Sequence, residues 1–112
     1  MKLKQKPAEK VWADFQSSEQ LTDLQLEKFQ KYEAYLSARN KEFNLTAIKD
    51  LSGIIRQHFV DSLALRKFFD LNSLKCIADI GTGAGFPAIP LKIMYPHLRV
   101  ILLEVTKKKQ QF

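Results

Sequence analysis

A glycine-rich turn between two apolar segments constrains the fold of this chain more than any other feature. The segment Lys75–Ile80 is short, apolar and bounded by turn residues, which is typical of a buried parallel strand. Three glycines follow within residues 81–85, and a helix is predicted from near Pro87, because proline is tolerated in a first helical turn. Leu98–Glu104 predicts a second buried strand. This order is that of the first half of a doubly wound α/β unit with a parallel sheet.

The same turn predicts a binding site. Glycine allows a tight turn and lets a ligand lie against bare backbone, and N–H groups at a helix start favour a negative ligand group such as a carboxylate. Asp79 ends the first strand, and Glu104, at the tip of the second, could accept two hydrogen bonds from adjacent ribose hydroxyls. The candidate binding residues are Asp79, Gly81, Thr82, Gly83, Gly85, Phe86 and Glu104.

The spacing of the glycines bears on the kind of ligand. They follow G-x-G-x-G, whereas a dinucleotide site has G-x-G-x-x-G, and Phe86 stands where the third dinucleotide glycine would be. This spacing argues against a nicotinamide-dependent oxidoreductase, although that alternative stays open. A second alternative is an ordinary turn that binds nothing.

Two helices are predicted ahead of the first strand. Residues 19–39 carry an apolar stripe, with Ser18 or Thr22 as a possible cap, and residues 40–47 read as a loop. A second helix is predicted over 51–69, opened by Asp50 or Ser52. On it, His58, Asp61 and Ser62 are spaced to lie near one another. A hydrolase triad is disfavoured, because its members rarely come from one helical turn and no nucleophile elbow is present. We expect a local hydrogen-bonded cluster.

The charge distribution and the composition further limit the kind of protein that this chain can be. The net charge of +6 lies at the two ends: residues 1–10 and 107–109 each carry +3, and the remainder balances. We therefore expect residues 1–18 to form a basic tail, more often a solvated arm than a phosphate-binding one. No apolar run approaches the length of roughly 20 residues that spans a bilayer, no secretory signal is recognisable, and Cys76 is the single cysteine, expected in a buried strand. These features predict a cytoplasmic protein.

Four segments together resemble one family. Asn44–Ile48 (NLTAI), His58–Leu63 (HFVDSL), Asp79–Pro90 and Leu102–Glu104 are similar, in order and spacing, to the glucose-inhibited division protein B family, the bacterial small-subunit ribosomal RNA guanine-N7 methyltransferases. The resemblance covers roughly residues 20–112. It implies a class I methyltransferase (Rossmann-like) fold, with S-adenosylmethionine as cofactor, small-subunit ribosomal RNA as partner, and neither metal nor membrane.

The resemblance also implies roles for individual residues. Backbone at the three glycines would contact the methionine and ribose, Phe86 would close over the loop, and Asp79 would orient the loop or bind the methionine ammonium through water. Asn44, His58 and Asp61 would lie on the substrate side, with a packing role equally open, and Lys107 and Lys108 would lie where RNA approaches. Guanine N7 has a lone pair and no proton to lose, so orientation of the reactants could suffice without a general base. No catalytic residue is identified.

Members of this family are about twice as long as the chain. We therefore expect an N-terminal fragment with three parts: a tail over 1–18, a helical segment over 19–72, and the start of the S-adenosylmethionine-binding domain over 73–112. The chain alone is expected to be inactive. The alternative is a non-catalytic remnant that binds cofactor or RNA, and the oligomeric state is left open.

Overall fold

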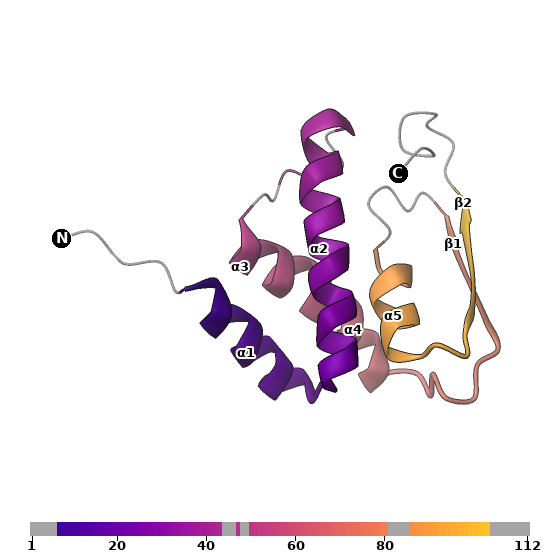
Figure 1. Cartoon of the computed structure of the whole chain (residues 1–112). Helices are drawn as coiled ribbons and strands as arrows, with labels where there is room; N and C mark the ends of the chain where they lie inside the picture. The colour runs from indigo at the N-terminus through magenta and orange to yellow at the C-terminus, as the bar shows by residue number, and fades with distance from the viewer. Residues whose placement is uncertain (1–6, 44–46, 48–49, 81–85, 104–112) are drawn as a thin grey trace.

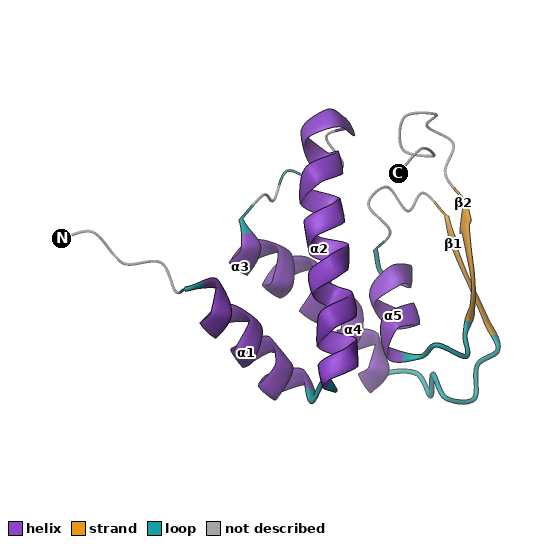
Figure 2. Cartoon of the chain, in the orientation of Figure 1, coloured by secondary structure: helices purple, strands orange, loops and turns teal. Residues whose placement is uncertain are grey.

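The fold was analysed in a computed structural model, which describes residues 7–43, 47, 50–80 and 86–103. Helices come first and a small parallel sheet follows (Figure 1; Figure 2). The elements are α1 (Ala8–Glu19), α2 (Asp23–Phe43), a continuous helical run, β1 (Cys76–Ile80), α5 (Ala88–Met94) and β2 (Arg99–Leu103). The continuous run consists of α3 (Leu51–Gly53), the π-helical η1 (Ile54–Val60), α4 (Asp61–Leu63) and the 3₁₀-helical η2 (Ala64–Lys67).

The N-terminal tail expected over 1–18 is wrong from Ala8 onward, because α1 occupies Ala8–Glu19. Phe15 on this helix is only 2% exposed. At the end of α1, the carboxylate of Glu19 accepts a 2.5 Å hydrogen bond from the guanidinium of Arg66 in η2, and both side chains are largely shielded from solvent. Helix α1 is therefore packed onto the helical layer and is not a solvated arm.

A capping box sets the start of α2. The Thr22 hydroxyl accepts a hydrogen bond from the Gln25 backbone N–H at 3.1 Å, and the Gln25 side chain accepts one from the Thr22 N–H at 2.9 Å. The expected cap at Thr22 is thus confirmed, and α2 begins four residues later than position 19. It also runs on to Phe43, so the loop expected over 40–47 is wrong for residues 40–43.

The second expected helix, over 51–69, corresponds to the helical run that ends at Lys67. Its start is capped as expected, because the Asp50 carboxylate accepts a 2.9 Å hydrogen bond from the Gly53 N–H. Within the two segments expected to be helical, Leu24 on α2 is 60% exposed, and Phe68, just beyond η2, is 77% exposed.

The core is centred on a cluster of aromatic rings at the meeting point of the helices and α5. Phe59 lies in its middle and is fully buried. Its ring is within 6.0 Å, between centroids, of four others. We define the aromatic cluster as Phe15, Phe29, Tyr32, Phe59 and Phe86.

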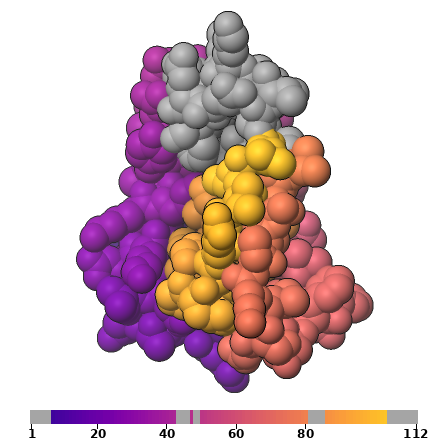
Figure 3. Space-filling model, turned by 90° about the vertical axis from the view of Figure 1, so that its right-hand side faces the viewer, coloured from indigo at the N-terminus to yellow at the C-terminus, as the bar shows by residue number. Residues whose placement is uncertain are grey.

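Strands β1 and β2 are parallel, as expected, and α5 crosses between them; the register pairs Cys76 with Arg99 and Ile80 with Leu103. Helix α5 and α2 lie on one side of this sheet (Figure 1). The opposite side is uncovered among the described residues, and Figure 3 looks directly onto it. We call this the open face: Cys76, Ala78, Ile80, Arg99, Ile101 and Leu103.

The expectation of two buried strands is therefore wrong for this chain. Alternate residues of β1 are exposed, among them Ile80 at 78%, and Cys76 is exposed too, although it was expected to be buried. The strand pattern itself was interpreted correctly, but burial on both faces needs a second layer. The described residues supply a two-stranded sheet with one layer, and a complete doubly wound sheet is not among them.

Candidate functional site

The structure describes four of the candidate site residues: Asp79, Phe86, His58 and Asp61. The others lie outside the described residues, and their assignment rests on the sequence alone. These are Asn44, Gly81, Thr82, Gly83, Gly85, Glu104, Lys107 and Lys108.

Asp79 is the next-to-last residue of β1 and is half-buried on the side that faces α5. Its Oδ2 atom is buried and has no hydrogen-bond partner within the described ranges. Burial raises the pKa of this carboxyl, and the backbone N–H of Ala88, at the start of α5, partly opposes the shift. The end of β1 thus holds a hydrogen-bond acceptor that lacks a donor, which is a natural contact for a polar ligand group.

Phe86 directly follows the glycine segment in sequence and is half-buried. Its ring is stacked on the imidazole of His58, with centroids 4.3 Å apart and planes inclined by 10°. It also lies 5.8 Å from the ring of Tyr32 and 6.0 Å from that of Phe59. Phe86 therefore joins the residues that follow the glycine segment to the helical layer.

Of the hydrogen-bonded cluster expected for His58, Asp61 and Ser62, the structure shows the bond from Ser62 to the His58 backbone. The Ser62 hydroxyl donates a 2.6 Å hydrogen bond to the backbone carbonyl of His58, so it is directed away from the role of a nucleophile. Burial lowers the pKa of His58, and the nearby Asp61 carboxylate works in the opposite direction. Asp61 itself is solvent-exposed.

The contact between His58 and Phe86 was not predicted, because the family resemblance implies a substrate-side position for His58 and a cofactor contact for Phe86. Tyr32 and Phe59, which complete the surroundings of Phe86, were not among the candidate site residues. No local signal could have revealed these contacts, because the residues lie 27 or more positions from Phe86 in the sequence.

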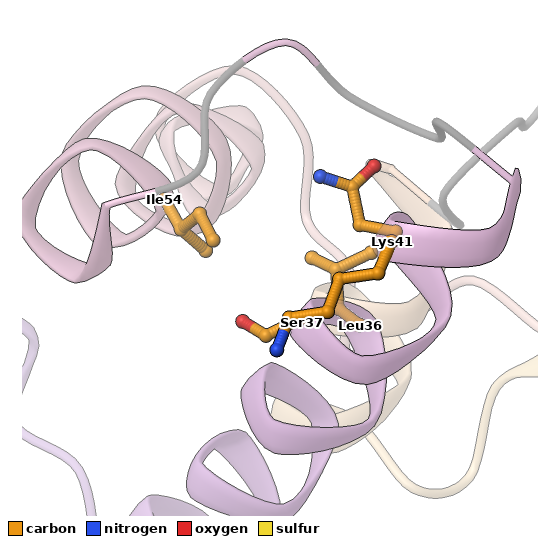
Figure 4. Close-up of a pocket in the computed structure, with 5 residues that line it drawn as sticks. Leu36, Ser37, Lys41 and Ile54 are labelled. Carbon is orange, nitrogen blue, oxygen red and sulfur yellow. The ribbon is translucent and has the colours of Figure 1, made fainter.

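A small pocket lies between the end of α2 and the start of η1 (Figure 4). Ile54 faces Leu36 and Ser37 across it. Its volume of about 110 Å³ is enough for a few water molecules but well below the roughly 300 Å³ of a small cofactor site. This pocket is not the place for a nucleoside-bearing ligand. Its lining residues are Leu36, Ser37, Asn40, Lys41 and Ile54.

In the described part of the chain, no three His, Cys, Asp or Glu side chains come together as a metal site would require. Nor does any helix there combine the length and the apolar character needed to traverse a membrane.

The order of the helices, strands and candidate site residues points to one class of protein. The elements are a helical layer, a first parallel strand with a half-buried acid at its next-to-last position, a glycine-rich connection, a crossover helix and a second parallel strand. This order is consistent with the opening of a methyltransferase-like α/β fold. The family model for rRNA small subunit methyltransferase G, GidB, matches residues 25–112, and the chain belongs to this family.

Curated relatives agree with the family match. Over 92 residues the chain is 46% identical to the ribosomal RNA small subunit methyltransferase G of Aster yellows witches'-broom phytoplasma, covering 82% of this chain and 43% of that protein. It is 44% identical to the protein of the same name from Staphylococcus epidermidis over 104 residues, which cover 90% of this chain and 44% of the relative. The chain thus spans less than half the length of these relatives.

Proposed function

We propose that this chain contributes the N-terminal part of an S-adenosylmethionine-dependent methyltransferase that modifies guanine N7 of 16S ribosomal RNA in the cytoplasm. The observation that carries the proposal is the buried Oδ2 of Asp79, which has no hydrogen-bond partner among the described residues and precedes the glycine segment of a chain in the methyltransferase G family. Its curated relatives are named as ribosomal RNA methyltransferases, which supports the substrate class.

The residues present fit the proposed cofactor. An ammonium group, or a water bound to one, would supply the donor that Asp79 Oδ2 lacks. Glu104 would accept hydrogen bonds from the ribose, and backbone at Gly81, Gly83 and Gly85 would lie along the methionine part. When bound, S-adenosylmethionine supplies an electrophilic methyl group. The chain's own task is to hold and orient that cofactor, which suffices because guanine N7 needs no base to activate it.

The residues proposed to face the RNA substrate differ in the support that each has. Asp61 is exposed and free to face an RNA surface, whereas the ring of His58 is engaged with Phe86. Asn44, Lys107 and Lys108 are proposed from the sequence alone.

Titration with S-adenosylmethionine tests the proposal. We expect a full-length version of the protein to bind one equivalent by calorimetry, and to bind no NAD under the same conditions, because Phe86 replaces the third dinucleotide glycine. We also expect it to transfer a methyl group to 16S ribosomal RNA at a site that borohydride and aniline cleave, the reaction of 7-methylguanosine. Binding of NAD in preference to S-adenosylmethionine, or binding of neither, would refute the proposal.

Asp79→Asn is expected to weaken S-adenosylmethionine binding by about 10- to 100-fold, because a hydrogen bond to a charged group contributes roughly 1.5–3 kcal/mol. The isosteric amide keeps the shape of the side chain and removes its charge. Since burial raises the pKa of Asp79, the folded state of the wild type loses stability as pH rises through that pKa. The variant is therefore expected to be as stable as the wild type near neutral pH, or more stable.

Calorimetry measures the cofactor affinity of Asp79→Asn, and thermal unfolding at two pH values measures its stability. Asp70→Asn is the matched control, because Asp70 is an exposed carboxylate just before the turn that leads to β1. Equal cofactor affinity of Asp79→Asn and wild type would remove Asp79 from the site.

A further inference from the structure

We propose that His58 is a positioning residue, which holds Phe86 and through it orients the backbone at the start of α5 for cofactor binding. This inference rests on the proposed function and assigns His58 to the cofactor side of the site. It also gives the helical layer a part in cofactor affinity.

The ring geometry is the first support. A centroid distance of 4.3 Å with an inclination of 10° means that one face of the imidazole lies against one face of Phe86. Such a pair contributes about 0.5–1.5 kcal/mol beyond the area that it buries. One face of the imidazole is thus covered by Phe86, which suits a packing surface better than a group that must reach a substrate.

Two neighbouring residues of η1 hold Phe86 from different sides. His58 stacks on it, and Phe59, the next residue, approaches its ring to 6.0 Å. Successive side chains of a helix point in different directions around its axis, so the rings of His58 and Phe59 approach Phe86 from different directions. The ring of Tyr32 on α2 is a third neighbour of Phe86, with the two ring centroids 5.8 Å apart.

Phe86 lies between the glycine segment and the start of α5, two parts of the candidate cofactor site. Gly85 precedes it in the sequence, and Ala88, two residues later, is the first residue of α5 and has its N–H group at the Asp79 carboxyl. A shift of Phe86 would therefore move the N–H that acts on Asp79. By this route, His58 influences the acid proposed to contact the cofactor without contacting it itself.

Substitutions of His58 in a full-length version test this role. We expect His58→Ala to raise the S-adenosylmethionine dissociation constant by about three- to tenfold, the range that one aromatic pair supplies. His58→Phe, which keeps a flat ring but has no titratable nitrogen, is expected to restore the affinity to within about twofold of wild type. Adding Phe86→Leu to His58→Ala should cost less than the two single effects combined, because both remove the same contact.

A spectroscopic measurement on the chain itself is independent of the cofactor. The ring protons of His58 should show an upfield ring-current shift in NMR spectra that disappears in Phe86→Leu. Thermal unfolding of each variant identifies any that fails to fold, and Phe86→Leu then serves as the milder test of the same contact.

The outcomes separate this inference from the proposed function. If wild type binds S-adenosylmethionine and His58→Ala binds it equally well, the positioning role is refuted and the proposed function stands. Failure of His58→Phe to restore affinity would also refute it, because the imidazole nitrogens would then matter. If wild type binds no S-adenosylmethionine, the proposed function fails and this inference with it, while the ring-current shift still reports on the stack.

Discussion

Phe59→Ala is expected to lower the free energy of unfolding by about 3–5 kcal/mol, the usual cost of removing a large aromatic side chain from a core. Phe59 is fully buried, and its ring contacts more members of the aromatic cluster than any other described ring does. Its loss would remove one of the ring contacts between the helical layer and Phe86, leaving those of His58 and Tyr32, and would create a cavity at the junction. Since single domains are stable by only about 5–15 kcal/mol, this loss is a large fraction of the total stability.

Urea unfolding, followed by the fluorescence of Trp12, measures this effect. Trp12 is a suitable probe because its ring lies 6.2 Å from that of Phe15, within the same core. Phe68→Ala is the control: its side chain is 77% exposed, and we expect a change within about 0.5 kcal/mol. A loss below about 1 kcal/mol in Phe59→Ala would mean that the aromatic cluster does not hold the two layers together.

The 112-residue chain alone is expected to transfer no methyl group to ribosomal RNA. Its open face leaves Ile80, Ile101 and Leu103 exposed at 78, 38 and 49%, and a two-stranded sheet is marginal without further strands or a second layer. The chain spans 43 and 44% of two relatives that are named as methyltransferases. A site formed at the ends of several strands would be incomplete on two strands.

Transfer of a radiolabelled methyl group from S-adenosylmethionine to 30S subunits and to free 16S RNA checks this expectation, with a full-length version as the positive control. Transfer by the short chain at a rate within about tenfold of the control would contradict it. In that case the two described strands and their loops would suffice for the reaction.

Local signals predicted much of this fold. The crossover helix after Pro87, the Thr22 cap and the two parallel strands each follow from a few adjacent residues. Helix α1 was missed because its apolar positions are few and the lysines before it dominate the composition of that end. The burial of the strands was overestimated for a different reason: their residue types suit a sheet covered on both faces, and the described chain covers one.

The candidate site was likewise predicted where adjacent residues determine it, and missed where distant residues meet. Asp79 was identified from its place at the end of a strand before a glycine turn, and the structure adds that its Oδ2 is buried, with no hydrogen-bond partner in the described part of the chain. The stack of His58 on Phe86 had no counterpart in the sequence, because tertiary packing brings those rings together across 28 positions.

The exposed position of Cys76 has a practical consequence. It is the chain's single cysteine, and its thiol lies on the open face, beside Arg99 in the register of the two strands. Access to the thiol controls how fast it is alkylated. The rate at which a maleimide labels Cys76 therefore reports directly on whether anything covers that face, whether a further layer of the same polypeptide or another molecule, with no mutation needed.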